Sequence, residues 1–146
     1  MIAQTIQLAL APVFVLVAIG NILNLLSTRL SRVVDRSRLL QSRHAETEGA
    51  EHDMVVREIR TVDLRIKLIG RAMRALVVGS LAIGLTVALL FLEELVGVDL
   101  QRVAAVSFMA ALGLLMWALV LFLRETQTAS AALRIPKEYL EHERPL

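Results

Sequence analysis

The sequence predicts an all-α integral membrane protein with three transmembrane helices, the first two of which extend into a cytoplasmic antiparallel helical hairpin. Three stretches of 21 residues, 6–26, 72–92 and 103–123, are almost free of charge. As a helix, each covers about 31 Å, which matches the hydrocarbon core of a bilayer. Hydrophobic residues make up 56% of the chain and the mean hydropathy is +0.64, well above the average of soluble domains.

The chain of 146 residues is expected to form a single membrane domain. Residues 27–71 then form the cytoplasmic hairpin and residues 124–146 a cytoplasmic tail. The first stretch is expected to be retained as a span, because no basic residue precedes it and several arginines follow it. There is no cysteine, which excludes disulfides, thiolate metal sites and a cysteine nucleophile.

The distribution of positive charge predicts the orientation. Of sixteen Lys and Arg residues, eleven lie between positions 29 and 74, and none precedes the first stretch. The short connection between the second and third stretches carries Glu93, Glu94 and Asp99. Basic residues next to spans stay on the cytoplasmic side. We therefore expect the amino terminus outside, the carboxyl terminus inside, and a location in the bacterial cytoplasmic (inner) membrane.

Apolar residues continue with a 3.5-residue period from the spans into the charged connection, as in the seam of a coiled coil. From the first stretch outward the pattern is Ile19, Leu23, Leu26, Leu30, Val33, Ser37 and Leu40, in which only Ser37 is polar; before the second stretch it is Val55, Ile59, Val62, Ile66, Ile69, Met73 and Leu76. Both helices are therefore expected to extend without a break to a polar turn at residues 44–53. The tail is expected to stay helical to about Ile135, before Pro136.

Polar residues at the inner end of the first stretch are the candidate pore lining. Asn21 and Asn24 share a helix face, and Gly20, Asn24 and Thr28 form a stripe at four-residue spacing. Such amides hold helices together. In a symmetric oligomer they could instead form polar rings, with Arg29 and Arg32 at the inner mouth. Small residues at Gly20, Ser80, Gly84, Ala88, Ser107 and Ala111 are the candidate helix-packing positions.

Basic residues beside the membrane suggest contact with anionic lipid headgroups at the cytoplasmic face; the candidates are Arg29, Arg32, Arg71 and Arg74. A solvated helix face is the alternative interpretation of the same charges. A protein partner could also dock on the projecting hairpin. Nucleic acid is not expected as a partner, since acidic residues alternate with the basic ones and aromatic platforms are lacking.

Motifs for catalysis or for a cofactor are missing, and no metal site is expected. The chain has no glycine-rich phosphate loop, no GxSxG and no HExxH. His44 and His52 share the turn with acidic residues, but their spacing matches no established metal motif. The middle of each stretch also lacks ionisable side chains, which argues against proton-coupled transporters and voltage sensors. We expect a protein that is not an enzyme.

The sequence resembles a family of small bacterial membrane proteins catalogued as domain of unknown function 2721. The resemblance covers nearly the whole chain. It rests on Leu10-Ala11-Pro12-Val13-Phe14, on Gly20 and Asn24, on the run from Arg29 to Arg36, on the apolar hairpin with Phe91 and Phe108, and on Leu123-Arg124-Glu125. It implies three spans and a bacterial membrane, and no activity. A three-helix unit gains no hydrophobic drive within lipid, so we expect it to pack as a homo-oligomer. Two functional hypotheses follow: a gated ion-conducting pore lined by the first span, or a non-catalytic scaffold or regulatory subunit that docks a partner through its hairpin.

Overall fold

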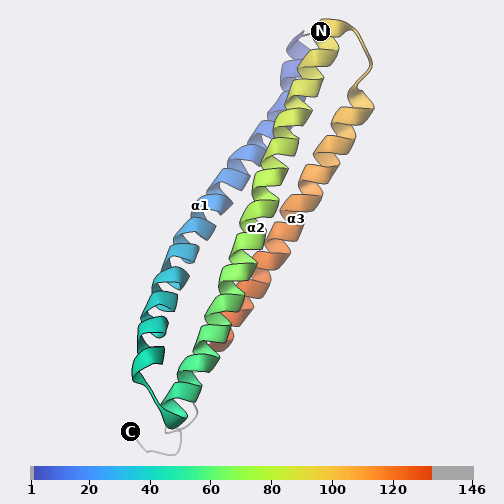
Figure 1. The fold of residues 1–146 in the computed structure, drawn as a ribbon. Coiled ribbons are helices and arrows are strands. Elements are labelled where there is room, and N and C mark those ends of the chain that lie inside the picture. The colour runs from blue at the N-terminus through green and yellow to red at the C-terminus, as the bar shows by residue number, and fades with distance from the viewer. Residues whose placement is uncertain (1, 133–146) are drawn as a thin grey trace, which may run out of the picture.

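The protein is all-helical throughout the part that the computed structural model describes, residues 2–132. It contains α1 (Ile2–Glu46), α2 (Gly49–Val96) and α3 (Gln101–Ala132). Figure 1 shows an elongated bundle in which α1 and α2 lie side by side and run in opposite directions, with α3 beside α2. The prediction of an all-α protein is confirmed. All three helices are long and apolar enough to cross a membrane, which supports a membrane location.

Buried side chains recur every seven residues in each helix. They are Ile19, Leu26, Val33 and Leu40 in α1, Val55, Val62, Ile69, Leu76 and Ile83 in α2, and Ala104, Ala111 and Ala118 in α3. Those in α1 and α2 up to Leu76 belong to the apolar seam that the sequence predicts. The intervening seam positions, such as Leu30 and Ile66, are half-buried against the same core. One face of each helix is therefore predominantly apolar.

The contact between α2 and α3 is close because small residues face each other. A Cβ atom built on Gly79 would lie 3.6 Å from the carbonyl oxygen of Ala111 and 3.6 Å from Cβ of Leu114. Ser107 adds a polar contact, since its Oγ donates to the carbonyl of Ala82 at 2.9 Å. Small residues and a hydroxyl are the usual means by which helices associate in lipid.

The turn between α1 and α2 is shorter than the predicted residues 44–53. Only Thr47 and Glu48 lie outside the helices. Two local features allow this tight reversal. Gly49 has a φ of 65°, which favours glycine, and the Thr47 hydroxyl donates to the carbonyl of Arg43 at 2.9 Å. At the far end of α2, Gly97 has a φ of 73° and its N–H donates to the carbonyl of Glu93.

The tail is described only in part. Residues 124–132 continue α3, and the predicted helix end near Ile135 lies outside the described residues.

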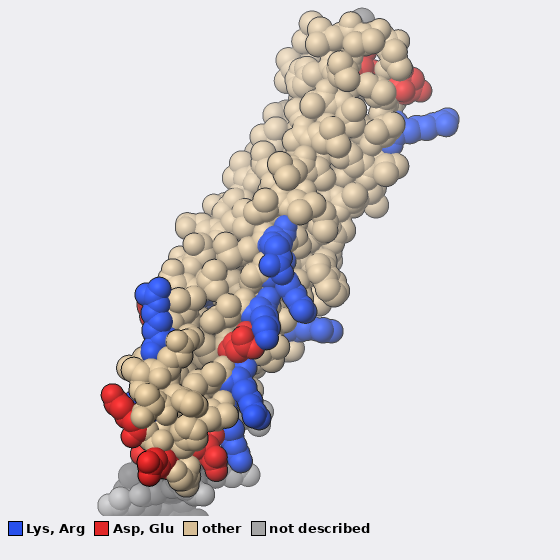
Figure 2. Space-filling view, viewed as in Figure 1, with Lys and Arg blue, Asp and Glu red and all other residues tan. Residues whose placement is uncertain are grey.

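Charged and apolar side chains occupy different parts of the bundle surface along its length. Figure 2 shows Lys and Arg gathered on the half nearer the α1–α2 turn, followed by a long stretch without charge and a smaller charged group at the opposite end. Large apolar side chains point outward along the uncharged stretch; Phe14, Leu81 and Val106 are each exposed over about 70% of their surface (70%, 70% and 69%). So much outward apolar surface is expected of helices that face lipid.

Candidate functional site

A fully buried carboxylate marks the centre of the candidate site. Glu125 lies on α3 at the seven-residue spacing that Ala104, Ala111 and Ala118 begin, and none of its side-chain surface is exposed. A buried carboxylate without partners is strongly destabilising, so its surroundings must supply positive charge.

Two arginines from the other two helices supply that charge. Arg65 of α2 donates through Nε to Oε1 of Glu125 at 2.9 Å. Arg29 of α1 places Nη2 at 3.1 Å from Oε2, an ion pair without the alignment of a hydrogen bond. The Arg29 guanidinium also lies 5.1 Å from the ring centroid of Phe122, a cation–π distance. These three ionised residues, the Arg29–Glu125–Arg65 cluster, join all three helices.

The cluster lies just beyond the predicted spans. Arg29 follows the end of the first span by three residues, and Glu125 follows the end of the third by two. The two arginine side chains keep 28% and 23% of their surface exposed, while Glu125 keeps none. The cluster therefore has a closed side formed by α3 and an open side formed by the arginines.

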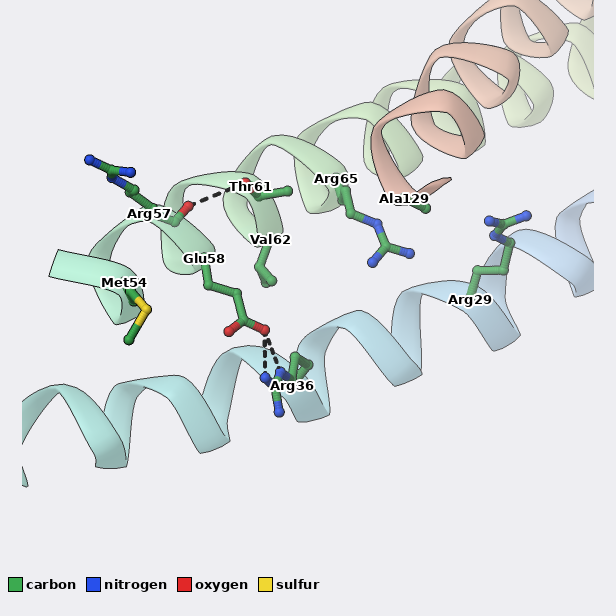
Figure 3. Close-up of a pocket in the computed structure, with 9 residues that line it drawn as sticks. All are labelled: Arg29, Arg36, Met54, Arg57, Glu58, Thr61, Val62, Arg65 and Ala129. Carbon is green, nitrogen blue, oxygen red and sulfur yellow. Dashed lines mark hydrogen bonds and ion pairs between the residues drawn. The ribbon is translucent and has the colours of Figure 1, made fainter. Parts of the chain in front are cut away.

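On that open side is a groove of about 820 Å³ between α1 and α2, at the end of α3 (Figure 3). It is lined by Arg29, Arg36, Met54, Arg57, Glu58, Thr61, Val62, Arg65 and Ala129. Arg36 pairs with Glu58 at 2.6 Å across the two helices. Figure 3 shows the guanidinium groups of Arg29 and Arg65 extending into the space between the helices, whereas that of Arg57 points away. The groove, here called the arginine groove, thus combines basic groups with apolar walls.

The candidate pore residues lie on the outward face of α1, with one exception. Asn21, Asn24, Thr28 and Arg32 are exposed on the single chain. The Thr28 hydroxyl donates to the carbonyl of Asn24 within α1 at 3.1 Å, and the two amides have no side-chain partner among residues 2–132. Arg29 is the exception, because it turns toward Glu125 instead of lying with the other four.

The lipid-headgroup candidates divide in the same way. Arg32, Arg71 and Arg74 are exposed and free to reach the surroundings, whereas Arg29 is held in the cluster.

Of the packing candidates, Ser107 and Ala111 lie in the contact between α2 and α3. Ser80 is half-buried and its hydroxyl donates to the carbonyl of Leu76 in its own helix at 2.9 Å. Gly20, Gly84 and Ala88 are exposed, so they do not pack within this chain. The glycine that does pack, Gly79, is absent from the predicted set.

The opposite end of the bundle holds a smaller polar group. Gln101 donates through Nε2 to Oε1 of Glu93 at 3.1 Å, and Thr5 donates to Oε2 of Glu94 at 3.4 Å. These contacts tie the start of α1 and the start of α3 to the end of α2. Within residues 2–132 no group of His, Cys, Asp and Glu side chains is arranged to hold a metal ion. His44 and His52 lie with 4.5 Å between their ring centroids, and Nδ1 of His52 lies 3.5 Å from the Thr47 hydroxyl.

A family model described as a protein of unknown function (DUF2721) matches residues 9–135. The chain belongs to this family. The DUF2721 match includes all three residues of the Arg29–Glu125–Arg65 cluster and every residue that lines the arginine groove. No curated protein and no solved structure matches the chain.

Sequence reasoning missed the cluster, although one signal could have found it. Because Glu125 follows the third apolar stretch, it falls within the tail that the sequence predicts at residues 124–146. The seven-residue spacing from Ala104 through Ala118 places it on the buried face, and this spacing is visible in the sequence. A charged residue in register with an apolar seam indicates a partner on a neighbouring helix.

Proposed function

We propose that the protein is a homo-oligomeric membrane protein in which α1 from several copies lines a gated ion-conducting pore. The supporting observation is the outward position of Asn21 and Asn24 on an otherwise apolar part of α1. Amide groups that face lipid remain without hydrogen-bond partners, which is unfavourable. Contact with α1 of a second copy satisfies them and contributes about 0.6–2 kcal/mol for each hydrogen bond.

The spacing of the polar residues favours a pore over a simple dimer contact. Asn21, Asn24, Thr28 and Arg32 recur every three or four residues, so that in a closed ring each would form one polar ring around the axis. Arg32 at one mouth favours anions. Farther along the same face, the exposed side chains are Val17 and Phe14. An apolar constriction of this kind excludes water, so the resting pore is closed.

The orientation in this proposal follows the charge distribution. The basic half of the bundle and the α1–α2 turn face the cytoplasm, and the Glu93–Asp99 end faces outward. Arg32, Arg71 and Arg74 are exposed where the helices leave the membrane. Each contributes roughly 1 kcal/mol of attraction to an anionic leaflet. The proposed location is the cytoplasmic membrane of a bacterium.

Single-channel recording tests the pore. Purified protein in planar bilayers should conduct rarely, and Val17→Asn should raise the open probability by hydrating the constriction. Leu85→Asn is the matched control, since Leu85 is 54% exposed on α2 against 58% for Val17 on α1. In the conducting variant, Arg32→Glu should shift selectivity from anions to cations. A Val17→Asn protein that never conducts, or one that conducts no more than the Leu85→Asn control, contradicts the proposal.

A second candidate function is a non-catalytic scaffold or regulatory subunit. The observation that favours it is the exposure of apolar side chains on the basic half of the bundle, Leu39 (48% exposed) on α1 and Met54 (64% exposed) on α2. Cross-linking in native membranes separates the two functions. A scaffold should give cross-links to another protein that Arg32→Ala with Asp35→Ala abolishes, while recovery of self-contacts alone favours the pore.

A further inference from the structure

We propose that the arginine groove binds a phosphate-bearing anion, held by Arg29, Arg36 and Arg65. The ligand is a phosphate ester, from either a lipid headgroup or a soluble compound. This proposal does not depend on the pore, because all three arginines belong to one copy of the chain and lie away from the outward stripe of α1.

Free hydrogen-bond donors point into the groove. Arg65 contacts Glu125 through Nε, which leaves both of its terminal nitrogens without a partner among residues 2–132. Arg29 contacts Glu125 through Nη2 alone. A guanidinium has five N–H donors in a fixed plane, so each arginine keeps donors for an oxyanion. Figure 3 shows both groups in the space between α1 and α2.

Glu125 holds these two arginines in place before any ligand arrives. Its carboxylate is fully buried behind them and contacts both, and the Phe122 ring packs against Arg29. Fixing a long side chain in its bound position reduces the entropy lost on binding. Glu125 is therefore a positioning residue that would not itself touch the anion.

The charge of the groove suits a phosphate ester. Three arginines, Arg29, Arg36 and Arg65, face the groove, and the acids beside them are Glu58 in the lining and Glu125 behind it, which leaves an excess of one positive charge. A phosphate monoester carries about −1.5 to −2 at neutral pH and has three strong acceptor oxygens. Arginine matches such oxygens in pairs, better than lysine does.

The groove also has room and apolar surface for the rest of an ester. Its volume of about 820 Å³ lies within the usual range of ligand sites. Met54, Val62 and Ala129 form apolar parts of the wall. Because Arg29 and Glu125 lie within a few residues of the predicted membrane edge, the groove is accessible both to a lipid headgroup and to a soluble compound.

The full chain in nanodiscs of phosphatidylcholine tests the site. In one arm, 10% phosphatidic acid is added to the discs; in the other, soluble glycerol 3-phosphate is titrated into discs without it. Native mass spectrometry and thermal unfolding report binding. Arg36→Gln should weaken binding roughly tenfold, as expected for one charge-assisted hydrogen bond, and Glu58→Gln should strengthen it. Arg60→Gln is the control, because Arg60 is exposed and does not line the groove.

The two arms of the experiment distinguish a lipid headgroup from a soluble compound as the source of the phosphate ester. Binding in the phosphatidic acid arm alone assigns the site to a lipid headgroup, and saturable binding of glycerol 3-phosphate assigns it to a soluble ester. Arg36→Gln leaves Glu125 and its two arginines intact, and the pair with Glu58 that it removes is exposed. An unchanged melting temperature without ligand therefore shows that loss of binding in that variant does not reflect unfolding. The proposal is overturned if neither probe binds at millimolar concentration. It is also overturned if Arg36→Gln and Arg60→Gln lower affinity equally.

Discussion

Glu125 and Arg65 are sixty residues apart in the sequence, yet a hydrogen bond of 2.9 Å joins them across two helices. The carboxylate is fully buried and the arginine is 23% exposed. Because Arg29 contacts the other carboxylate oxygen, a change at position 125 affects the packing of all three helices. This contact is therefore the place where a single substitution should reveal most about how the bundle is held together.

We predict that Glu125→Gln destabilises the fold strongly. Removing the charge of one member of a buried pair costs up to about 3–5 kcal/mol, and the partial exposure of both arginines should place the loss near 3 kcal/mol. Reversible unfolding in mixed detergent micelles measures it. Glu58→Gln is the control, since its pair with Arg36 is exposed and should contribute less than about 1 kcal/mol. Equal losses of unfolding free energy in the two variants would show that the buried pair stabilises the fold no more than the exposed pair does.

Gly79→Leu should separate α2 from α3. The space at Gly79 accepts a Cβ atom at 3.6 Å from its neighbours, but not a branched side chain. Overpacking of this kind typically costs about 1–3 kcal/mol, and we expect a lower melting temperature. Gly84→Leu, on the same helix, faces open space and should not lower the melting temperature of the monomer. A destabilised Gly84→Leu monomer would contradict the packing described above.

Gly49→Ala and Gly70→Ala should change stability in opposite directions. Gly49 has a φ of 65°, where a Cβ atom costs roughly 1–2 kcal/mol. Gly70 lies inside α2 with open space around it, so alanine there should stabilise the helix by about 0.5–1 kcal/mol. Thermal unfolding of the two variants side by side tests this. If both substitutions stabilise, the two-residue turn does not form as described.

Asn21→Leu combined with Asn24→Leu should weaken self-association. The two amides are exposed on α1, and leucine suits lipid better than an amide does. Native mass spectrometry in mild detergent should show oligomers for the unchanged chain and a shift toward monomer for the double variant. Gln7→Leu is the control, because Gln7 is also exposed on α1 but lies near its other end. A wild-type protein that is monomeric under these conditions contradicts the homo-oligomer.

The absence of cysteine makes the orientation simple to test. We predict that a membrane-impermeant maleimide labels Val98→Cys in intact cells, because the proposed topology places the loop between α2 and α3 outside. Glu48→Cys, in the turn between α1 and α2, should react only after the cells are permeabilised. Both positions are exposed, so accessibility within the protein does not decide the result. The opposite labelling pattern would reverse the proposed topology.

Much of the fold could be predicted from the sequence because the apolar signals are local. The length of each apolar stretch predicts three membrane-crossing helices, and the period of residues such as Leu26 and Val62 predicts which face is buried. The turn was overestimated, since polar residues such as His44 and Asp53 favour a loop by composition but remain helical. The candidate site was harder to predict, because pairing between Glu125 and Arg65 depends on which residues of different helices lie opposite each other.

Buried apolar residues recur every seven positions in each helix, so apolar contacts alone allow more than one lengthwise alignment of the helices. The charged residues favour one of these alignments. If one helix slid along its neighbours by seven residues, about 10 Å, apolar side chains would again meet apolar side chains. If α3 slid by this distance toward the α2–α3 loop, Glu125 would lie opposite Ile22 and Ala72, and its carboxylate would be buried without a counter-charge. A slide in the other direction would bring it opposite Glu58, a residue of like charge, beside Arg36. A single polar position can select one alignment among several of similar hydrophobic contact. Glu125 thus favours one lengthwise position of α3 against α1 and α2, whereas the apolar residues alone would allow more than one.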